Sequence, residues 1–230
     1  MPRLERDIVG CLVPPRLPGR QRGFALLLAL ALVLSVAAYV LVAVLPRATA
    51  FRQQSIAETN LALREARAAL LSYALGRNGS GKVGYLPCPD TVYLGLPFDP
   101  IGSSNTPCGS MGVPSIGRLP WGTLDLAPTD VPLWYAVSGN YKILPAVEPN
   151  VGLPGTLVAG GQGDIVAVVL SPGAALAGQN RAANPYAVAE YLEGTNRNAA
   201  GPFAAEGTGN DRFIAITRAE LAAILPPVPP

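Results

Sequence analysis

Cys88 and Cys108 are the two residues whose type and spacing most directly indicate covalent chemistry in this chain. A disulfide between them would close a loop of about 20 residues and, by chain entropy, would contribute on the order of 3 kcal/mol to the free energy of unfolding. A metal-binding or redox pair is the alternative, but the CxxC spacing is missing and the chain has no histidine. We therefore expect a disulfide between Cys88 and Cys108.

The histidine count of 0 also limits catalysis, because it excludes Ser-His-Asp triads, His-ligated zinc and imidazole acid–base chemistry. An enzyme that used carboxylates alone would need two Asp or Glu side chains close together in a cleft. No such pair stands out in the sequence. We therefore expect a protein that is not an enzyme and has no catalytic residue.

Four aspartates, Asp90, Asp99, Asp125 and Asp130, are candidate calcium ligands, because Ca²⁺ prefers carboxylate oxygens. Their spacing does not match the D-x-[DN]-x-[DN]-G pattern of a calcium loop. The alternative is that they are solvated loop residues. We expect no cofactor, and calcium at these aspartates is the one exception left open.

Large aromatic side chains are the remaining candidates for ligand contact. Trp121, Trp134 and Tyr135 carry apolar areas that are rarely left exposed, so we expect them in the core or in a groove. Arg118 and Asp211 are expected to form ion pairs or to cap backbone groups rather than to catalyse a reaction. The sequence GSGK at residues 79–82 lacks the frame of a phosphate-binding loop and is expected to be an ordinary loop.

An uncharged apolar run at residues 24–45 would measure about 33 Å as a helix, which is enough to cross a membrane. It follows a basic leader at residues 1–23, whose five Arg outnumber Glu5 and Asp7, and this bias keeps the N-terminus in the cytoplasm. The rest of the chain is then expected in an oxidising compartment outside the cytoplasm. Without the leader the formal net charge changes from +2 to about −1, so the basic pI does not indicate nucleic-acid binding.

The junction at residues 22–28, RGFALLL, bears on how the run is processed. A secretory signal would have a shorter apolar stretch, although ATA at residues 48–50 follows the run, and a lipoprotein signal fails because no apolar stretch precedes Cys11. The junction resembles the type IV prepilin signal, in which a basic segment ending in Gly meets an apolar helix. That resemblance implies cleavage after Gly23 by prepilin peptidase, N-methylation of Phe24, and packing of the retained helix with other pilin or pseudopilin subunits.

Leu28 departs from the pattern of that family. Subunits of the filament shaft usually carry Glu at this fifth mature position, where the carboxylate pairs with the terminal amine of a neighbour, since a buried charge needs a partner. The absence of Glu resembles the minor subunit at the tip of a type II secretion pseudopilus. We therefore expect Phe24 and Leu28 to pack in a filament and Leu28 to mark a minor subunit at a tip or initiation position.

Residues 46–76 are expected to continue the same helix, with a bend at Pro46 where a backbone hydrogen bond is lost; two helices joined by a hinge are the alternative. Gly76 and the glycines that follow it should end the helix. Apolar residues recur on one side of this stretch and charged residues on the other. The apolar stripe comprises Ile56, Leu63, Ala66, Leu70 and Tyr73, and the solvated side comprises Arg52, Glu58, Arg64, Glu65 and Arg67.

The remainder of the chain is rich in Pro and Gly between short apolar runs, which is typical of a domain of short strands and long loops. The β-branched run at residues 165–170 is the strongest strand, and residues 132–137 and 213–217 are its expected partners. Thr217 and Glu220 form a capping-box pattern that predicts a short final helix.

Several blocks resemble a group of proteobacterial pilin-like or pseudopilin-like proteins. They are YLPCPD at 85–90, GRLPWGTL at 117–124, LWYAVS at 133–138 and NDRFIAITR at 210–218. Proteins of this kind sometimes bind calcium, and in many members the segment after CPD is rich in Asp, Asn and Gly. Here it is TVYL at residues 91–94, which argues against an ion site at that position.

The expected fold is therefore α+β, with a long N-terminal helix packed on a small antiparallel sheet whose long loops carry a disulfide. The expected divisions are a cleaved leader at 1–23, a transmembrane and filament helix at 24–45, an amphipathic helix at 46–76, an extracytoplasmic domain at 77–225 and a Pro-rich tail at 226–230. We expect a minor pilin or pseudopilin of a type II secretion or type IV pilus system, anchored in the bacterial inner membrane with its domain in the periplasm and with no nucleic-acid partner. The alternative is a single-span periplasmic ligand-binding domain outside any filament.

Overall fold

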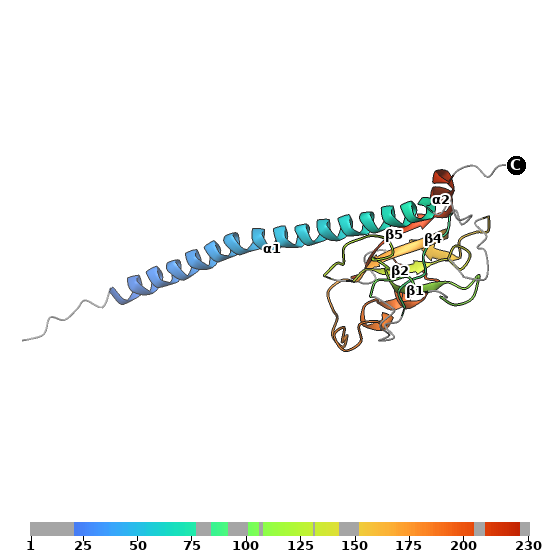
Figure 1. Cartoon of the computed structure of the whole chain (residues 1–230). Helices are drawn as coiled ribbons and strands as arrows, with labels where there is room; N and C mark the ends of the chain where they lie inside the picture. Colours follow the sequence, from blue (N-terminus) through green and yellow to red (C-terminus); the bar gives the residue numbers. More distant parts are fainter. Residues whose placement is uncertain are drawn as a thin grey trace, which may run out of the picture. The chain divides into compact units, whose positions relative to one another are not determined.

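The computed structural model of the chain describes residues 21–76, 84–91, 101–105, 108–130, 132–142, 152–204 and 210–225. The elements lie in the order shown in Figure 1. They are α1 (Gln21–Gly76), β1 (Ser115–Arg118), β2 (Trp134–Val137), β3 (Leu157–Ala159), β4 (Gln162–Ser171), the 3-10 helices η2 (Val188–Glu190) and η3 (Gly194–Arg197), β5 (Arg212–Thr217) and α2 (Arg218–Ile224). The fold class is α+β, as predicted.

The chain divides into two compact units, Met1–Ser55 and Ile56–Pro230, and α1 contributes to both. The backbone of α1 is helical over 56 residues and is not interrupted at Pro46, as expected for one long helix. It ends at Gly76, a residue without a Cβ that commonly terminates helices. The bend expected at Pro46 remains a prediction.

In the second unit all strand pairs are antiparallel and β4 is the central strand of a five-stranded sheet. The second half of β4 pairs with β2, whose other edge pairs with β1, and the first half of β4 pairs with β3. The strand β5 pairs with β4 along most of its length. The predicted pairing of residues 165–170 with 132–137 and 213–217 is therefore confirmed.

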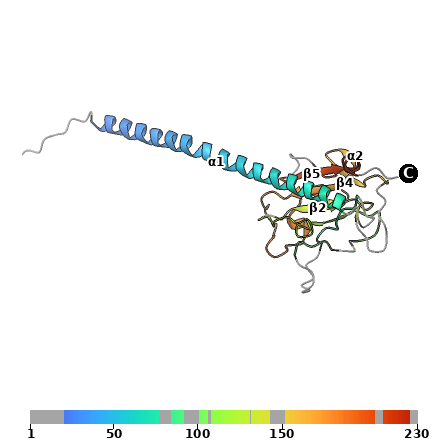
Figure 2. The ribbon, with the colours of Figure 1, turned by 45° about the horizontal axis from the view of Figure 1, so that its top comes forward.

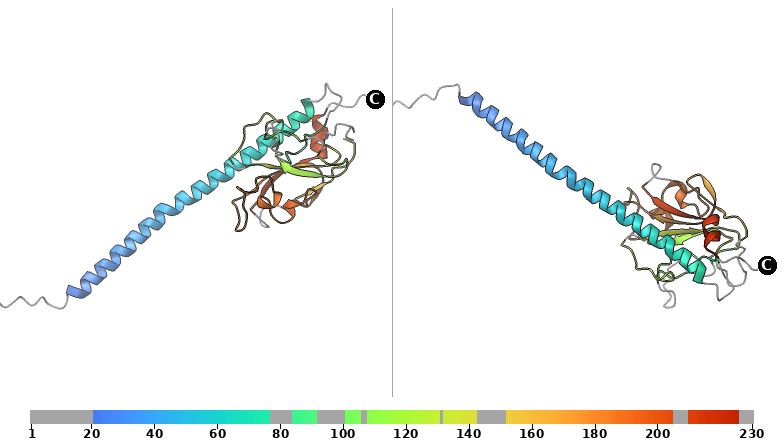
Figure 3. Two further views of the ribbon diagram at one scale, coloured as in Figure 1. Left: turned by 60° about the horizontal axis from the view of Figure 1, so that its bottom comes forward. Right: turned by 90° about the horizontal axis from the view of Figure 1, so that it is seen from above.

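The sheet is buried on both faces, which explains why residues 165–170 form an unbroken apolar run. One face packs against residues 56–76 of α1, which lie along the sheet in both views of Figure 3. The cluster between them includes Leu63, Ala66, Leu70 and Ala74 from the helix and Tyr135, Val137, Ala167 and Val169 from the strands. The opposite face carries a second cluster, which includes Trp134, Leu157, Val168, Leu170, Tyr191, Leu192 and Phe203.

The predicted helical stripe agrees with this packing in most positions. Leu63, Ala66 and Leu70 are buried and Tyr73 is partly buried against the same cluster. Arg67, expected on the solvated side, is partly exposed, and its guanidinium donates to the exposed Glu220 carboxylate of α2 at 2.8 Å. Helical periodicity alone does not predict this ion pair.

The helix α2 begins with the predicted capping box. The Thr217 hydroxyl accepts a hydrogen bond from the Glu220 backbone N–H at 3.1 Å, and the Glu220 carboxylate accepts one from the Thr217 N–H at 2.9 Å. The helix follows β5 directly, and the two lie together in Figure 2. The predicted final helix is thus confirmed, while the tail at 226–230 lies outside the described residues.

Candidate functional site

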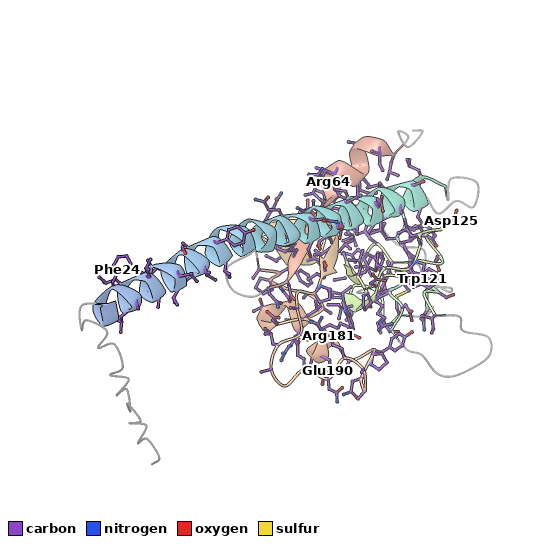
Figure 4. The ribbon with its side chains drawn as sticks, turned by 90° about the vertical axis from the view of Figure 1, so that its left-hand side faces the viewer. Phe24, Arg64, Trp121, Asp125, Arg181 and Glu190 are labelled. Atoms are coloured by element: carbon purple, nitrogen blue, oxygen red, sulfur yellow. A yellow bond between two sulfur atoms is a disulfide. The ribbon has the colours of Figure 1, made fainter. Side chains whose placement is uncertain are left out.

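The segment Gly23–Val40 of α1 is a helix long and apolar enough to span a membrane. None of this segment is buried within the chain (0%). The side chains of Phe24 and Leu28 are 67% and 56% exposed, and Figure 4 shows Phe24 projecting from the start of the helix. Such a continuous apolar surface needs lipid or another apolar surface to cover it.

The expected processing position lies in the first turn of this helix. Gly23 follows Gln21 and Arg22, the first two helical residues, and a Cβ built on Gly23 would meet no atom within 4 Å. A side chain at position 23 would therefore have open space around it.

Cys88 and Cys108 form the predicted disulfide, with their Cα atoms 5.7 Å apart. Both residues are buried. Tyr135 fixes the neighbouring backbone because its hydroxyl donates to the Pro87 carbonyl at 3.2 Å. The disulfide therefore attaches the loop before β1 to the main core.

Lys142 supports the same loop, although the sequence offered no indication of this role. Its side chain is 1% exposed, and its ammonium donates to the carbonyls of Cys108 at 2.6 Å and Val113 at 2.7 Å. It also donates to the Ser115 hydroxyl at 2.9 Å. Burial lowers the pKa of this ammonium from its ordinary value. The sequence missed this cluster because its members approach one another only after the strands pair.

A cleft of about 430 Å³ opens in the second unit beside the loop that follows β1. Ala62 and Glu65 of α1 line it together with Ile101, Trp121 and the segment around Asp130. Its volume lies within the range of about 300–1,000 Å³ that is usual for small-molecule sites. Trp121 was expected in the core or in a groove, and it lines this cleft, whereas Trp134 and Tyr135 are fully buried.

Arg118 lies at the edge of this cleft and is held by aromatic rings. Its guanidinium carbon is 4.5 Å from the centroid of Tyr186 and 5.7 Å from that of Tyr191. The guanidinium also donates to the Tyr191 hydroxyl at 3.4 Å. We expected an ion pair or a backbone contact here; among the residues that the structure describes, the guanidinium stacks on aromatic rings. Arg181 stacks on Tyr191 at 5.0 Å, and Figure 4 places Arg181 and Glu190 close together.

The aspartates proposed as calcium ligands do not converge in the part of the chain that the structure describes. The buried Asp90 carboxylate accepts a hydrogen bond from the Gly102 N–H at 2.9 Å, and Asp125 and Asp130 are exposed. Asp99 and the loop at 79–82 lie outside the described residues. Among the described residues no three His, Cys, Asp or Glu side chains are grouped as metal ligands would be.

Asp211 has the backbone-capping role that was expected for it. Its buried carboxylate accepts hydrogen bonds from the Glu193 N–H and from the Asn196 side-chain amide, both at 3.0 Å. Burial raises the pKa of Asp211, and the nearby Glu193 carboxylate adds to that rise. The sequence did not indicate Glu193 or Asn196 as partners, because about fifteen residues or more separate them from Asp211.

Comparisons of the chain with protein-family models, with curated proteins and with solved structures found no match.

Proposed function

We propose that this chain is a non-enzymatic minor subunit of a pilin or pseudopilin type, anchored in the inner membrane by residues 24–45. The observation that carries the proposal is the wholly exposed apolar helix Gly23–Val40, which begins directly at the RGF sequence of residues 22–24. A prepilin peptidase would cleave after Gly23, and the mature chain would begin at Phe24. The system would be of the type II secretion or type IV pilus kind.

The mechanism in this proposal is mechanical. In the bilayer the apolar helix packs against lipid, and in a filament it packs against the same helix of other subunits. Assembly therefore exchanges one apolar environment for another without exposing the helix to water. Leu28 supports a minor subunit rather than a subunit of the filament shaft, because a shaft subunit of the family would have Glu at this position.

The second unit supplies the part that would face a cargo or a neighbouring subunit in the periplasm. Its disulfide supports an oxidising location, where such bonds persist. The buried disulfide attaches the loop before β1 to a sheet that is covered on both faces. No catalytic role is part of the proposal.

The proposal is tested by the mass of the N-terminal peptide of the membrane-extracted protein, from cells with and without prepilin peptidase. We expect a peptide that begins at N-methylated Phe24 only when the peptidase is present. Gly23→Leu should block this processing, because the added side chain occupies the position next to the cleaved bond. Gly10→Leu, the same change within the leader, is the matched control and should be processed normally.

Two results of that experiment would contradict the proposal. A mature protein that retains Met1 in cells with the peptidase would be an ordinary anchored protein. A mature protein that begins at Phe51, after the ATA sequence of residues 48–50, would be a secreted one.

The cleft beside Trp121 and Arg118 favours a second candidate function, a membrane-anchored periplasmic domain that binds a small ligand outside any filament. The apolar wall is accompanied by charged groups of both signs, the Arg118 guanidinium and the acidic side chains Glu65 and Asp130, which fits a largely apolar molecule that carries polar groups. This function needs no prepilin processing. The N-terminal peptide therefore distinguishes the two candidates, since retention of Met1 would favour the ligand-binding domain.

A further inference from the structure

The cleft of about 430 Å³ in the second unit has a largely apolar lining. Leu119, Leu133 and Tyr191 are buried residues that contribute to it. Ile101 and Trp121 line it as well, and they are 51% exposed and partly exposed, respectively. An apolar group that entered the cleft would remove these exposed surfaces from water, which is favourable.

Charged groups of both signs line the same cleft. Arg118 supplies a guanidinium, while Glu65 of α1 and Asp130 of the segment before β2 supply exposed carboxylates. The ion pairs that the described residues form with one another involve none of these three side chains. The positive group of the cleft is therefore not paired with its negative groups, and charges of both signs are available to a ligand.

Arg118 is held in place by its backbone and by its side chain. Its N–H donates to the Asp90 carbonyl at 2.8 Å, and its own carbonyl accepts from the Asp90 N–H at 2.9 Å. The guanidinium carbon lies 4.5 Å from the ring centroid of Tyr186 and 5.7 Å from that of Tyr191. A guanidinium fixed in this way is suited to a carboxylate, to which it can donate two parallel hydrogen bonds.

We propose that the cleft binds an amino acid or a short peptide with an apolar side chain. The carboxylate of the ligand contacts Arg118, and its ammonium group contacts Glu65 or Asp130. The apolar side chain lies against Ile101 and Trp121. This inference rests on the ligand-binding role given above as the second candidate function, and it names the class of ligand. It does not depend on the filament role, because the cleft belongs to the second unit alone.

Other common classes of ligand fit this lining less well. A nucleotide carries several negative charges, which Glu65 and Asp130 would repel. A fatty acid offers a carboxylate to Arg118 but nothing to the two acidic side chains. A sugar requires many hydrogen-bonding groups, whereas most of the lining is apolar. A zwitterion with an apolar side chain satisfies both signs of charge and the apolar wall together.

The test titrates the full-length chain, purified in detergent, with three probes by calorimetry, and a titration into micelles alone is the blank. L-phenylalanine carries both charges, phenethylamine lacks the carboxylate, and 3-phenylpropionate lacks the ammonium group. We expect L-phenylalanine to bind about tenfold more tightly than phenethylamine, because a site built for a polar group rejects a ligand without it. Its advantage over 3-phenylpropionate should be about threefold or more, since exposed carboxylates contribute less.

A fourth probe distinguishes a free amino acid from a peptide. In L-leucyl-L-phenylalanine the ammonium and the carboxylate lie further apart than in L-phenylalanine. Tighter binding of the dipeptide would identify a peptide as the ligand, and tighter binding of L-phenylalanine would identify a free amino acid. Both results support the inference.

Tryptophan fluorescence reports where the probe binds. The chain has 2 tryptophans, and Trp121 lines the cleft, whereas Trp134 is 1% exposed and is not a lining residue. We expect L-phenylalanine to change the emission of the wild type. Trp121→Phe should abolish this change while calorimetry still detects binding, because Phe preserves an apolar wall.

Charge-removing variants assign the contacts. Arg118→Gln should weaken L-phenylalanine about tenfold or more and leave phenethylamine unchanged. The double variant Glu65→Gln with Asp130→Asn should weaken L-phenylalanine about threefold or more without weakening 3-phenylpropionate. Retained binding of the analogue shows in each case that the cleft is still folded. Arg64→Gln and Asp125→Asn remove exposed charges outside the lining and, as matched controls, should bind all probes like the wild type.

Two results would overturn the inference. Equal affinities for L-phenylalanine and both analogues would mean that the cleft binds ligands of another class, and the ligand-binding role itself would stand. Binding of none of the four probes would mean that the cleft is not an amino-acid or peptide site. The mass of the N-terminal peptide decides separately between the two candidate functions, so a failure of the proposed function is distinguished from a failure of this inference.

Discussion

At the scale of single residues, Lys142 shows how one side chain can organise a loop. A buried ammonium is costly unless its three donors are satisfied, and here two carbonyls and one hydroxyl accept from it. One of the carbonyls belongs to Cys108, so the lysine and the disulfide fix the same point of the chain. Arg118 illustrates the other solution, a cation held by the faces of two tyrosine rings.

Replacing Lys142 by Met is expected to lower the free energy of unfolding by about 1–3 kcal/mol. The methionine fills a similar volume, but it removes the lysine donor from the part-buried Val113 carbonyl and leaves the Cys108 carbonyl with the Ser115 hydroxyl alone, and an unsatisfied group of this kind costs about 1–3 kcal/mol. Urea unfolding at neutral pH measures the change. Arg64→Met removes an exposed cation from α1 and, as the control, should change stability by less than about 0.5 kcal/mol. Equal effects of the two substitutions would contradict the role given to Lys142.

At the scale of elements, α2 is a short helix stabilised at its first turn by specific contacts. Thr217 and Glu220 form the capping box, and Glu220 also pairs with Arg67 of α1 at 2.8 Å. The hydrogen bond from the Thr217 N–H, with a smaller contribution from Arg67, holds the pKa of Glu220 below its ordinary value. The same carboxylate therefore caps α2 and joins it to α1.

The lowered pKa predicts how stability depends on pH. A carboxyl whose pKa is lower in the folded chain than in the unfolded chain stabilises the fold above the unfolded pKa, and this contribution is lost as pH falls through the folded pKa. At pH 7 we expect Glu220→Gln to be less stable than the wild type by about 0.5 kcal/mol, since Gln retains the capping hydrogen bond but not the charge. The difference should vanish between about pH 5 and pH 3 in urea unfolding. A difference that stays constant over this range would exclude a contribution from the Glu220 charge.

At the scale of the whole molecule, the two compact units differ in how much of their apolar surface they bury within the chain. The second unit buries its apolar residues in two clusters on the two faces of one sheet. Gly23–Val40, in the first unit, buries none of its apolar surface within the chain. The second unit therefore covers its own apolar residues. The apolar helix of the first unit must be covered by something outside the chain, which we propose to be a membrane and a filament.

Leu28→Glu tests where in a filament the chain belongs. A carboxylate within the apolar run costs about 2–3 kcal/mol in a bilayer unless it is paired, and in a filament shaft the terminal amine of a neighbour would pair with it. We expect the variant to crosslink to a different set of subunits from the wild type, whereas Leu28→Ile, which keeps the apolar surface, should not. Identical crosslinking of Leu28→Glu and the wild type would contradict a special position for this subunit.

The sequence predicted the features that depend on local chemistry or on a clear periodicity of apolar residues. The disulfide, the strand at residues 165–170 with both its partners, the stripe of Leu63, Ala66 and Leu70 and the capping box at Thr217 are all present. The strands β1 and β3 were not predicted, because four and three residues are too few to show a period. They form strands because β1 pairs with β2 and β3 pairs with β4 through backbone hydrogen bonds.

The sequence by itself determined which parts of this protein are apolar, which are helical and which two cysteines are available to pair, because composition and periodicity act over short stretches of chain. Only the tertiary structure decided which polar groups meet. Lys142 with the Cys108 carbonyl, Arg118 with Tyr186, and Glu193 with Asp211 are each separated by many residues. These contacts arise because pairing of the strands around β4 brings distant loops to the same edges and faces of one sheet, where a buried polar group must find whatever partner the fold places beside it.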